Sequence, residues 1–341
     1  MGGAWLAVAA ACAAACAAAF MLWDRSRSNG QARAAADARP ILFNVLDGGD
    51  PGAIDSLEPA QRRIVEAQAR SLLPKVKGRD KDVLARLLEK GGAVESARRQ
   101  SHSRRATSRA KAGDFLGEAG SPAAVGDLLD LVGLLDDPDQ KVRCSAALNL
   151  GRLGNVGAIA ALRASLEGVR PIPVDVVAEA IFQIRDYPEG LLRRGLLSPT
   201  ESERALSVEL LGRFQHLVAA DEVIELLLND PSVDVRARAA RSLGRMGVPG
   251  AVQPLLSCLG DGPSAVQSEV IWALGEIGGS EAIAALRAIL LGPSRTMGQR
   301  AASALVATGP PGIESLNRIA GERGHPAAPI AAAALVGEPA P

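Results

Sequence analysis

The sequence has few of the residues on which base-stacking and nucleic-acid-binding proteins depend. Only 3% of its 341 residues are aromatic, which is scarce for a protein that stacks nucleic-acid bases. The 38 basic residues are balanced by 38 acidic ones, so no global field draws the chain to nucleic acid. Histidine occurs three times and cysteine four times. These shortages disfavour binding through a large positive charge or through base stacking.

The few histidines and cysteines are not spaced as they are in reactive or metal-binding sites. His102, His216 and His325 lie far apart in the chain, and neither Cys144 nor Cys258 has a CxxC or Cys-His spacing. No GxxxxGK[ST] motif occurs, and no GxGxxG follows a strand pattern. Four cysteines, two of them in the apolar N-terminal segment, fit a reducing compartment. We therefore expect no catalytic residue, no cofactor and no metal site.

A repeated motif occupies most of the chain, and no window alternates as a half-buried strand does. The motif is clearest at Leu243 and again 31 residues later at Leu274, each followed by a glycine. Self-similarity at such a period is the signature of stacked repeats. Stepping along the chain by 30–34 residues finds eight anchor positions: Leu116, Leu150, Ile181, Leu211, Leu243, Leu274, Leu305 and Leu335.

Each unit reads as two helices. The first carries apolar residues at helical spacing, as in Val223, Leu226 and Leu227. An Asp-Pro or Gly-Pro step then breaks the chain, because proline cannot continue a helix that it interrupts. The second helix carries the anchor and ends on glycine, which tolerates the left-handed C-cap. The sequence therefore predicts an all-α fold, an α-solenoid of about eight stacked helical pairs over residues 95–341.

The motif resembles the short bacterial HEAT-like repeats that are named after phycobilin lyases. The resemblance covers roughly residues 103–337, and the units at Ile181 and Leu305 depart from it because they lack the full glycine pattern. It implies a HEAT-repeat fold and supplies no bilin site, because no motif residue carries one. The residues that carry it are Asp136-Asp137-Pro138, Val142-Arg143 and Leu150-Gly151-Arg152-Leu153-Gly154, with the copies that begin at Asp230 and Asp261.

Residues 3–23 are uncharged and long enough, as a helix, to cross a bilayer core of ~30 Å. Arginines follow this run and none precedes it, which favours a cytoplasmic solenoid. We expect a bacterial, single-pass anchor in the inner (cytoplasmic) membrane. A cleaved signal peptide is the alternative, because Ala17-Ala18-Ala19 forms an A-x-A site, although the positively charged n-region is missing. Residues 24–40 then read as a polar linker, and residues 41–94 as a helical cap or divergent repeat.

Two sets of basic residues stand out. Residues 98–111 hold six Lys or Arg and no acid, which indicates either a patch for anionic lipid or nucleic acid, or a solvated helix face. The second set lies seven residues before an anchor, on the anchor's edge of the helix. We expect each of these arginines to reach an aspartate in a neighbouring unit's turn, such as Asp137, Asp230 or Asp261. The set consists of Arg109, Arg143, Arg204 and Arg236.

The exposed side of the second helices is the candidate binding surface. Positions −5, −2 and +2 from an anchor lie opposite the core, on the layer that lines the concave surface of HEAT-like stacks. Tryptophan and arginine are the residues most enriched at interface hot spots. Read across the units, these positions predict one protein-binding patch: Arg213, Arg238, Arg241, Arg245 and Trp272.

We therefore expect a membrane-tethered, non-catalytic scaffold that binds a protein partner on its concave face and has no small-molecule substrate. The patch predicts an acidic partner segment if Trp272 is exposed; Trp272 packed between helices is the alternative. A lyase-type or other enzyme of the repeat family is a second possible function. A nucleic-acid-binding solenoid that uses residues 98–111 is a third. The partner's identity, the pathway and the oligomeric state do not follow from the sequence.

Overall fold

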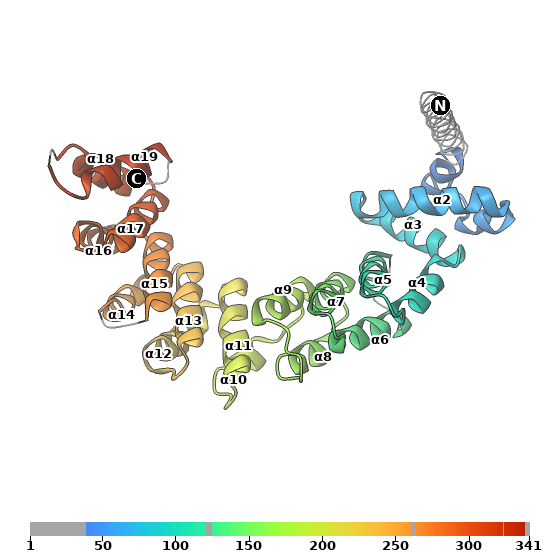
Figure 1. The fold of residues 1–341 in the computed structure, drawn as a ribbon, viewed down its shortest axis with the longest axis horizontal. Helices are drawn as coiled ribbons and strands as arrows, with labels where there is room; N and C mark the ends of the chain where they lie inside the picture. The colour runs from blue at the N-terminus through green and yellow to red at the C-terminus, as the bar shows by residue number, and fades with distance from the viewer. Residues whose placement is uncertain (1–38, 120–124, 261–262, 323, 338–341) are drawn as a thin grey trace, which may run out of the picture. The chain divides into compact units, whose positions relative to one another are not determined.

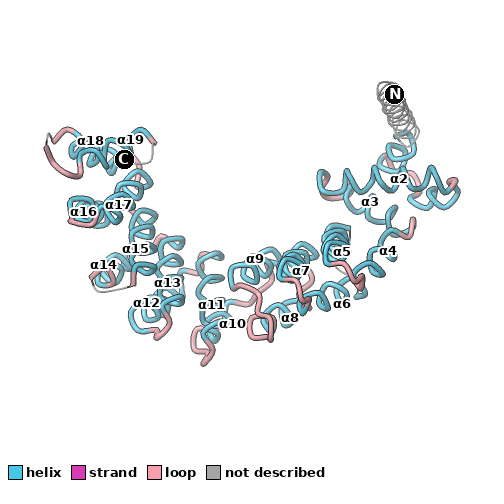
Figure 2. Tube along the Cα trace, viewed as in Figure 1, coloured by secondary structure: helices cyan, strands magenta, loops and turns pink. Residues whose placement is uncertain are grey.

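The computed structural model describes residues 39–119, 125–260, 263–322 and 324–337, and every regular element in these ranges is a helix. Figure 1 shows helices stacked side by side, and Figure 2 shows no strand among them. The all-α solenoid prediction is therefore confirmed for the described chain. The chain forms two compact units, which divide at Leu134/Leu135.

Unit 1, up to Leu134, is a stack of short helices. It begins with a helix over residues 39–46, so the last two residues of the predicted linker are helical. The further elements are η1 (Pro51–Ser56), α2 (Pro59–Leu72), η2 (Leu73–Lys75), α3 (Arg79–Lys90), α4 (Ala93–Ser101), α5 (Ala106–Ala119) and α6 (Val125–Gly133).

Unit 2, from Leu135, alternates helices of two layers, with short η turns between some of them. The first-helix layer holds α8 (Ala158–Ala164), α10 (Glu189–Gly195), α12 (Ala220–Asn229), α14 (Val252–Ser257), α16 (Gly279–Leu291) and α18 (Pro310–Ala320). The second-helix layer holds α7 (Gln140–Leu153), α9 (Val174–Ile184), α11 (Glu201–Phe214), α13 (Val233–Met246), α15 (Ser264–Ile277), α17 (Arg295–Ala307) and α19 (Ala328–Val336). Consecutive helices make one pair in unit 1, α4 with α5, and six pairs in unit 2, from α8 to α19, as the repeat period predicts.

The anchors of the repeat are core residues. One anchor falls in the second helix of each pair, and Leu335, in the last helix, is half-buried. Complete burial of a leucine side chain contributes about 1.5–3 kcal/mol, so the regularly spaced anchors of unit 2 supply much of its core. The seven anchors that are fully buried are Leu116, Leu150, Ile181, Leu211, Leu243, Leu274 and Leu305.

The glycine after the anchor sets the spacing between neighbouring second helices. A Cβ added at Gly151 would lie 2.7 Å from the Cα of Ala180 on the next helix, and one at Gly244 would lie 2.8 Å from the Cα of Ala273. The backbones therefore pack closely within the second-helix layer. The predicted glycine C-cap is confirmed at the later glycine of the motif, as at Gly154, where φ is +71°.

The repeat at Ile181 lacks the glycine after its anchor, as its sequence predicts. Phe182 stands where other units have the packing glycine, and its ring contacts that of Phe214 on α11 with centroids 5.1 Å apart. Arg185 and Gln215 end α9 and α11 with φ of 61° and 55°, where regular units have a capping glycine. The left-handed conformation costs these side chains about 1–2 kcal/mol each.

No helix in the described part of the chain is both long and apolar enough to cross a membrane. The expected anchor, residues 3–23, lies outside the described residues. The anchor and the signal-peptide alternative both stay predictions.

Candidate functional site

The arginines seven residues before the anchors fix the turn inside their own repeat. Arg143 donates from Nη1 to the carbonyl oxygens of Asp137 and Pro138, at 2.8 and 3.3 Å. Arg236 makes the equivalent bonds to Asp230 and Pro231. These hydrogen bonds satisfy backbone carbonyls at a helix break, which would otherwise lack partners. The expectation that a neighbouring unit's aspartate is the acceptor is therefore wrong for these hydrogen bonds.

Arg204 binds both a carbonyl of its own turn and an aspartate of the next repeat. It donates from Nη1 to the Ser198 carbonyl in its own turn, at 3.0 Å. Its Nε and Nη2 also bind both carboxylate oxygens of Asp230 in the next repeat, at 2.7 and 3.1 Å. This bidentate pair has the geometry in which arginine–carboxylate hydrogen bonds are strongest. The predicted link between an arginine and an aspartate of the neighbouring repeat is confirmed for Arg204 and Asp230.

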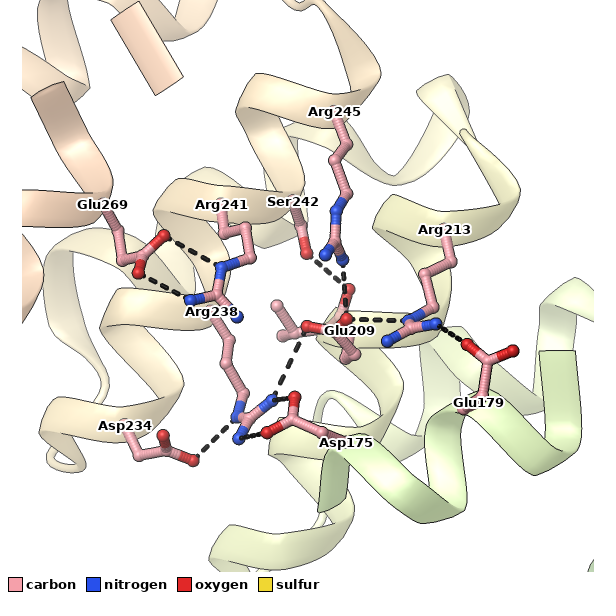
Figure 3. A network of polar contacts seen from close by, with 11 residues as sticks. Asp175, Glu179, Glu209, Arg213, Asp234, Arg238, Arg241, Ser242, Arg245 and Glu269 are labelled. Carbon is pink, nitrogen blue, oxygen red and sulfur yellow. Dashed lines mark hydrogen bonds and ion pairs between the residues drawn. The ribbon is translucent and has the colours of Figure 1, made fainter. Parts of the chain in front are cut away.

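The structure brings the four arginines of the predicted patch together on α11 and α13. Figure 3 shows them around the carboxylate of Glu209, which projects from α11 and is completely buried. Glu209 Oε1 accepts hydrogen bonds from Arg213 Nε at 2.8 Å and from Arg245 Nη1 at 2.6 Å. Arg238 Nη1 lies 3.6 Å from Glu209 Oε2, within ion-pair range. One buried carboxylate therefore holds three arginines from two adjacent repeats.

Arg238 is the most buried of these arginines and bridges three helices. Its side chain is 11% exposed. Its Nη1 and Nη2 bind the two oxygens of Asp175 on α9, at 2.6 and 3.2 Å, and its Nε binds Asp234 on α13 at 2.8 Å (Figure 3). The aspartates are each about half exposed. Arg238 therefore ties α9 and α13 together across α11.

Two further pairs extend the network outward (Figure 3). Arg241 binds both oxygens of Glu269 on α15, at 2.9 and 2.6 Å. Arg213 also binds Glu179 on α9 at 2.5 Å. Four guanidinium groups thus meet five carboxylates, so the cluster is one charge negative when all are ionised. We call these nine residues the ionic cluster.

Burial and hydrogen bonding act in opposite directions on the central carboxylate. Burial alone would raise the pKa of Glu209, because it disfavours the charged form. Hydrogen bonds from Arg245 and Arg213 outweigh burial and hold the pKa of Glu209 below its ordinary value. Burial would likewise lower the pKa of Arg238, but its bonds to Asp175 and Asp234 raise it. Glu209 and Arg238 are therefore both ionised at neutral pH.

Trp272 lies on α15 beside the ionic cluster, with its side chain 38% exposed. Its Cζ3 would be 3.0 Å from a Cβ added at Gly244, so one edge of the ring packs over that glycine on α13. The ring also borders a groove of about 540 Å³ between α15 and α17, lined in addition by Ile271, Ala304 and Ala307. Trp272 is thus neither a core residue nor fully exposed.

The prediction from sequence found the arginines and missed their partners. Counted from the anchors of their repeats, Glu179 and Glu209 lie at position −2 and Glu269 at position −5. These are positions from which the patch residues were selected. Asp175 lies one residue outside this pattern. A search for opposite charges at these positions in neighbouring units would have found most pairs. It could not have shown that Glu209 is buried, because that depends on how α11 and α13 pack.

Other candidate residues have local roles. Arg98, in the basic stretch 98–111, pairs with buried Asp127 at 2.8 Å, so part of this stretch is structural. His102 lies 3.3 Å from Asp130 and His216 lies 3.3 Å from Glu189. Within the described ranges, no group of three His, Cys, Asp or Glu residues is placed to hold a metal ion.

The cysteines and the remaining histidine lie singly. His325 Nδ1 accepts a hydrogen bond from the Ala327 amide in the turn before α19. Cys144 and Cys258 are half-buried free thiols, and burial raises the pKa of each. Thiols of raised pKa are poor nucleophiles at neutral pH.

Sequence models of protein families match two parts of the chain. A HEAT-repeat model matches residues 129–157, and a model of tandem HEAT repeats matches residues 220–306. The chain contains HEAT repeats. The second match covers α12 to α16 and most of α17, which include Trp272 and the α13 and α15 residues of the ionic cluster. No curated protein matches the sequence.

Among solved structures, those of the karyopherin Kap121p share the fold of these HEAT repeats. A mutant of Kap121p is 12% identical, with a TM-score of 0.55 over 88% of this chain and 41% of the Kap121p chain. Kap121p bound to the SUMO protease Ulp1p gives the same TM-score over 87% of this chain and 37% of that one. The chain spans about two fifths of these karyopherin chains, and the likeness shows the fold alone.

A weaker match is to the structure of a lyase complex. The complex of CpcE and CpcF, phycocyanin lyase from Nostoc sp. PCC7120, is 20% identical over 72% of this chain and 87% of that chain. Its TM-score is 0.33, too low to support any argument about activity.

Proposed function

We propose that this protein is a non-catalytic scaffold that binds a protein partner on the second-helix layer of unit 2. The observation that carries the proposal is a partly exposed tryptophan, Trp272, at the wall of a groove between α15 and α17. Tryptophan at the edge of a pocket is a common hot spot, because it offers a large apolar area with few rotatable bonds. The solved complexes of Kap121p with Ulp1p and Nup53p support a protein-binding role for such a fold.

The lining of the groove indicates which side chains a partner segment should carry. Trp272, Ala304 and Ala307 give it an apolar floor and wall, while Arg300 and Glu276 line it without an ion-pair partner among the described residues. A partner segment with one large apolar side chain could pack against Trp272, Ala304 and Ala307. Polar or oppositely charged residues on either side of it could pair with Arg300 and Glu276. The ionic cluster neutralises its own arginines, so it gives no reason for the partner to be acidic.

The ionic cluster has a positioning role in this proposal. It joins α9, α11, α13 and α15 through side chains that each have an oppositely charged partner. A surface held in one arrangement before binding loses less conformational entropy when the partner docks. The cluster therefore contributes to binding through the rigidity of the second-helix layer beside Trp272.

The tether is part of the proposal. Residues 3–23 would anchor the chain in the inner membrane, and the solenoid would face the cytoplasm, because arginines follow the apolar run and none precedes it. A partner would then be captured close to the membrane. No observation favours the enzymatic or nucleic-acid-binding alternatives strongly enough to propose them.

Site-directed photo-crosslinking in the source cell tests where the partner binds. A photoreactive amino acid replaces Ser303, an exposed residue of the groove. The matched control replaces Arg287, an exposed residue of α16 in the first-helix layer. We expect a discrete adduct with one protein at Ser303 and none at Arg287. Equal adducts at both positions, or no adduct at either, would refute binding in this groove.

A further inference from the structure

Positive and negative charges are unevenly distributed along the chain. Residues 39–134 of unit 1 contain 16 Lys or Arg and 13 Asp or Glu, whereas residues 135–341 of unit 2 contain 19 and 23. A small excess of positive charge therefore lies in unit 1, whose first described residue follows the expected membrane anchor by 15 residues. Positive charge beside a membrane anchor is attracted to the anionic lipids of the cytoplasmic leaflet.

The structure places part of this charge around one cavity. A pocket of about 610 Å³ lies between α3 and the segment that joins the first helix to η1. Arg79, Arg86 and Lys90 line it from α3, spaced seven and four residues apart and so on one face of the helix. Within the described part of the chain, these three side chains have no ion-pair or hydrogen-bond partner. This distinguishes them from the arginines of the ionic cluster, each of which is paired.

The opposite wall of the pocket leaves room for a ligand. Gly48, with φ of +110°, faces the guanidinium of Arg79, and a Cβ there would lie 3.4 Å from Arg79 Nη2. Asp50 and Glu89 also line the pocket, and Asp50 Oδ1 accepts a hydrogen bond from the Gly52 amide. Three cations thus face two carboxylates, one of which is engaged in a turn. The pocket keeps a net positive charge.

We propose that the cationic wall of this pocket, formed by Arg79, Arg86 and Lys90, docks unit 1 on an anionic bilayer, with a lipid phosphate in the pocket. The proposal rests on the membrane tether proposed above. The 15 residues between the expected anchor and residue 39 span at most about 50 Å, so the pocket cannot leave the neighbourhood of the membrane surface. Each cation near the anionic leaflet contributes roughly a 5-fold factor to binding.

Lysine footprinting of the full-length chain in vesicles tests the docking. The chain is reconstituted in vesicles of phosphatidylcholine alone, or with a third of phosphatidylglycerol, and acetylated while mass spectrometry follows each lysine. We expect Lys90 to react several-fold more slowly in the anionic vesicles, and ~1 M salt to remove the protection by screening. Lys141, an exposed lysine of unit 2, should react equally in both. Equal reaction of Lys90 in both vesicles would overturn the proposal.

Charge variants give a second readout that does not depend on Lys90 alone. Arg79→Gln with Arg86→Gln should abolish the protection of Lys90. The matched double variant in unit 2, Arg287→Gln with Arg318→Gln, should leave it intact. Thermal unfolding of each variant verifies the fold. Retained protection in the Arg79/Arg86 variant would overturn the proposal.

Two further arms distinguish lipid docking from binding of a soluble anion and from loss of the anchor. Protection of Lys90 by inorganic phosphate in phosphatidylcholine vesicles, without anionic lipid, would assign the pocket to a soluble anion and overturn lipid docking. Flotation of the vesicles tests the tether separately. A chain that fails to float lacks the membrane anchor, whereas a chain that floats with an unprotected Lys90 has the anchor and lacks the docking surface.

Discussion

Replacement of Glu209 by alanine should lower the free energy of unfolding by about 3–5 kcal/mol. The side chain is fully buried and is the shared acceptor of Arg213 and Arg245, with Arg238 also within ion-pair range. Its removal leaves three guanidinium groups facing one another in a partly buried space, where repulsion is weakly screened. Urea unfolding of the full-length chain, followed by circular dichroism, measures the change.

Glu276→Ala is the matched control, because Glu276 is an exposed carboxylate of the same layer without an ion-pair partner in the described chain. Its stability should change by less than about 0.5 kcal/mol. A Glu209 variant as stable as this control would show that the ionic cluster is not needed for folding.

The stabilisation by Glu209 should also depend on pH in a defined direction. Its pKa is lower in the folded protein than in the unfolded chain, where a glutamate titrates near ~4.3. The stabilisation is therefore complete above that value and is lost as the pH falls through the folded pKa. Glu209→Gln should remove this part of the acid sensitivity, which a comparison of unfolding curves between pH 7 and pH 3 measures.

Gly244→Ala should destabilise the protein by about 1–3 kcal/mol. The added Cβ would lie 2.8 Å from the Cα and 2.9 Å from the Cβ of Ala273, so α13 and α15 must separate. The loss should appear although alanine is the better helix former by about 1 kcal/mol. Unfolding of the variant by urea measures it.

Gly250→Ala is the control for this substitution, because a Cβ at Gly250 meets nothing within 4 Å. Its stability should change little. A Gly244 variant as stable as this control would mean that the second helices can separate freely, and that the glycine is not needed for their spacing.

The repeat pattern was sufficient to predict the helices and the core. A leucine that recurs every 30–34 residues must face the same way in each unit, and Leu243, Leu274 and their equivalents are buried as expected. Proline and aspartate between the helices predicted the turns, because their backbone preferences are local. Helix pairs follow from such signals without knowledge of distant contacts.

The partners of polar residues could not be predicted in the same way. Arg143 and Arg236 had a predicted position on the helix but could reach either a neighbouring aspartate or a carbonyl of their own turn. Helical spacing does not decide between acceptors at similar reach. Arg238 is the stronger example, because its partner Asp175 lies 63 residues away and meets it only once α9, α11 and α13 have stacked.

The ambiguity of Trp272 has the same origin. Its position on α15 indicated exposure, but the absence of a side chain at Gly244 lets its ring lean onto α13. A tryptophan that is 38% exposed keeps enough free surface to contact a partner and enough packing to hold one orientation. This combination is typical of residues that anchor an interface.

The most direct test of the proposed binding surface is the effect of Trp272→Ala on partner affinity and on stability, measured side by side. The partner is the protein crosslinked at Ser303, titrated against the wild-type and variant chains by calorimetry. We expect Kd to rise at least about 30-fold, equivalent to ~2 kcal/mol. We expect the loss of stability to stay below the roughly 3–5 kcal/mol typical of a core tryptophan. An unchanged Kd, or a stability loss of core size, would contradict a partner-binding role for this surface.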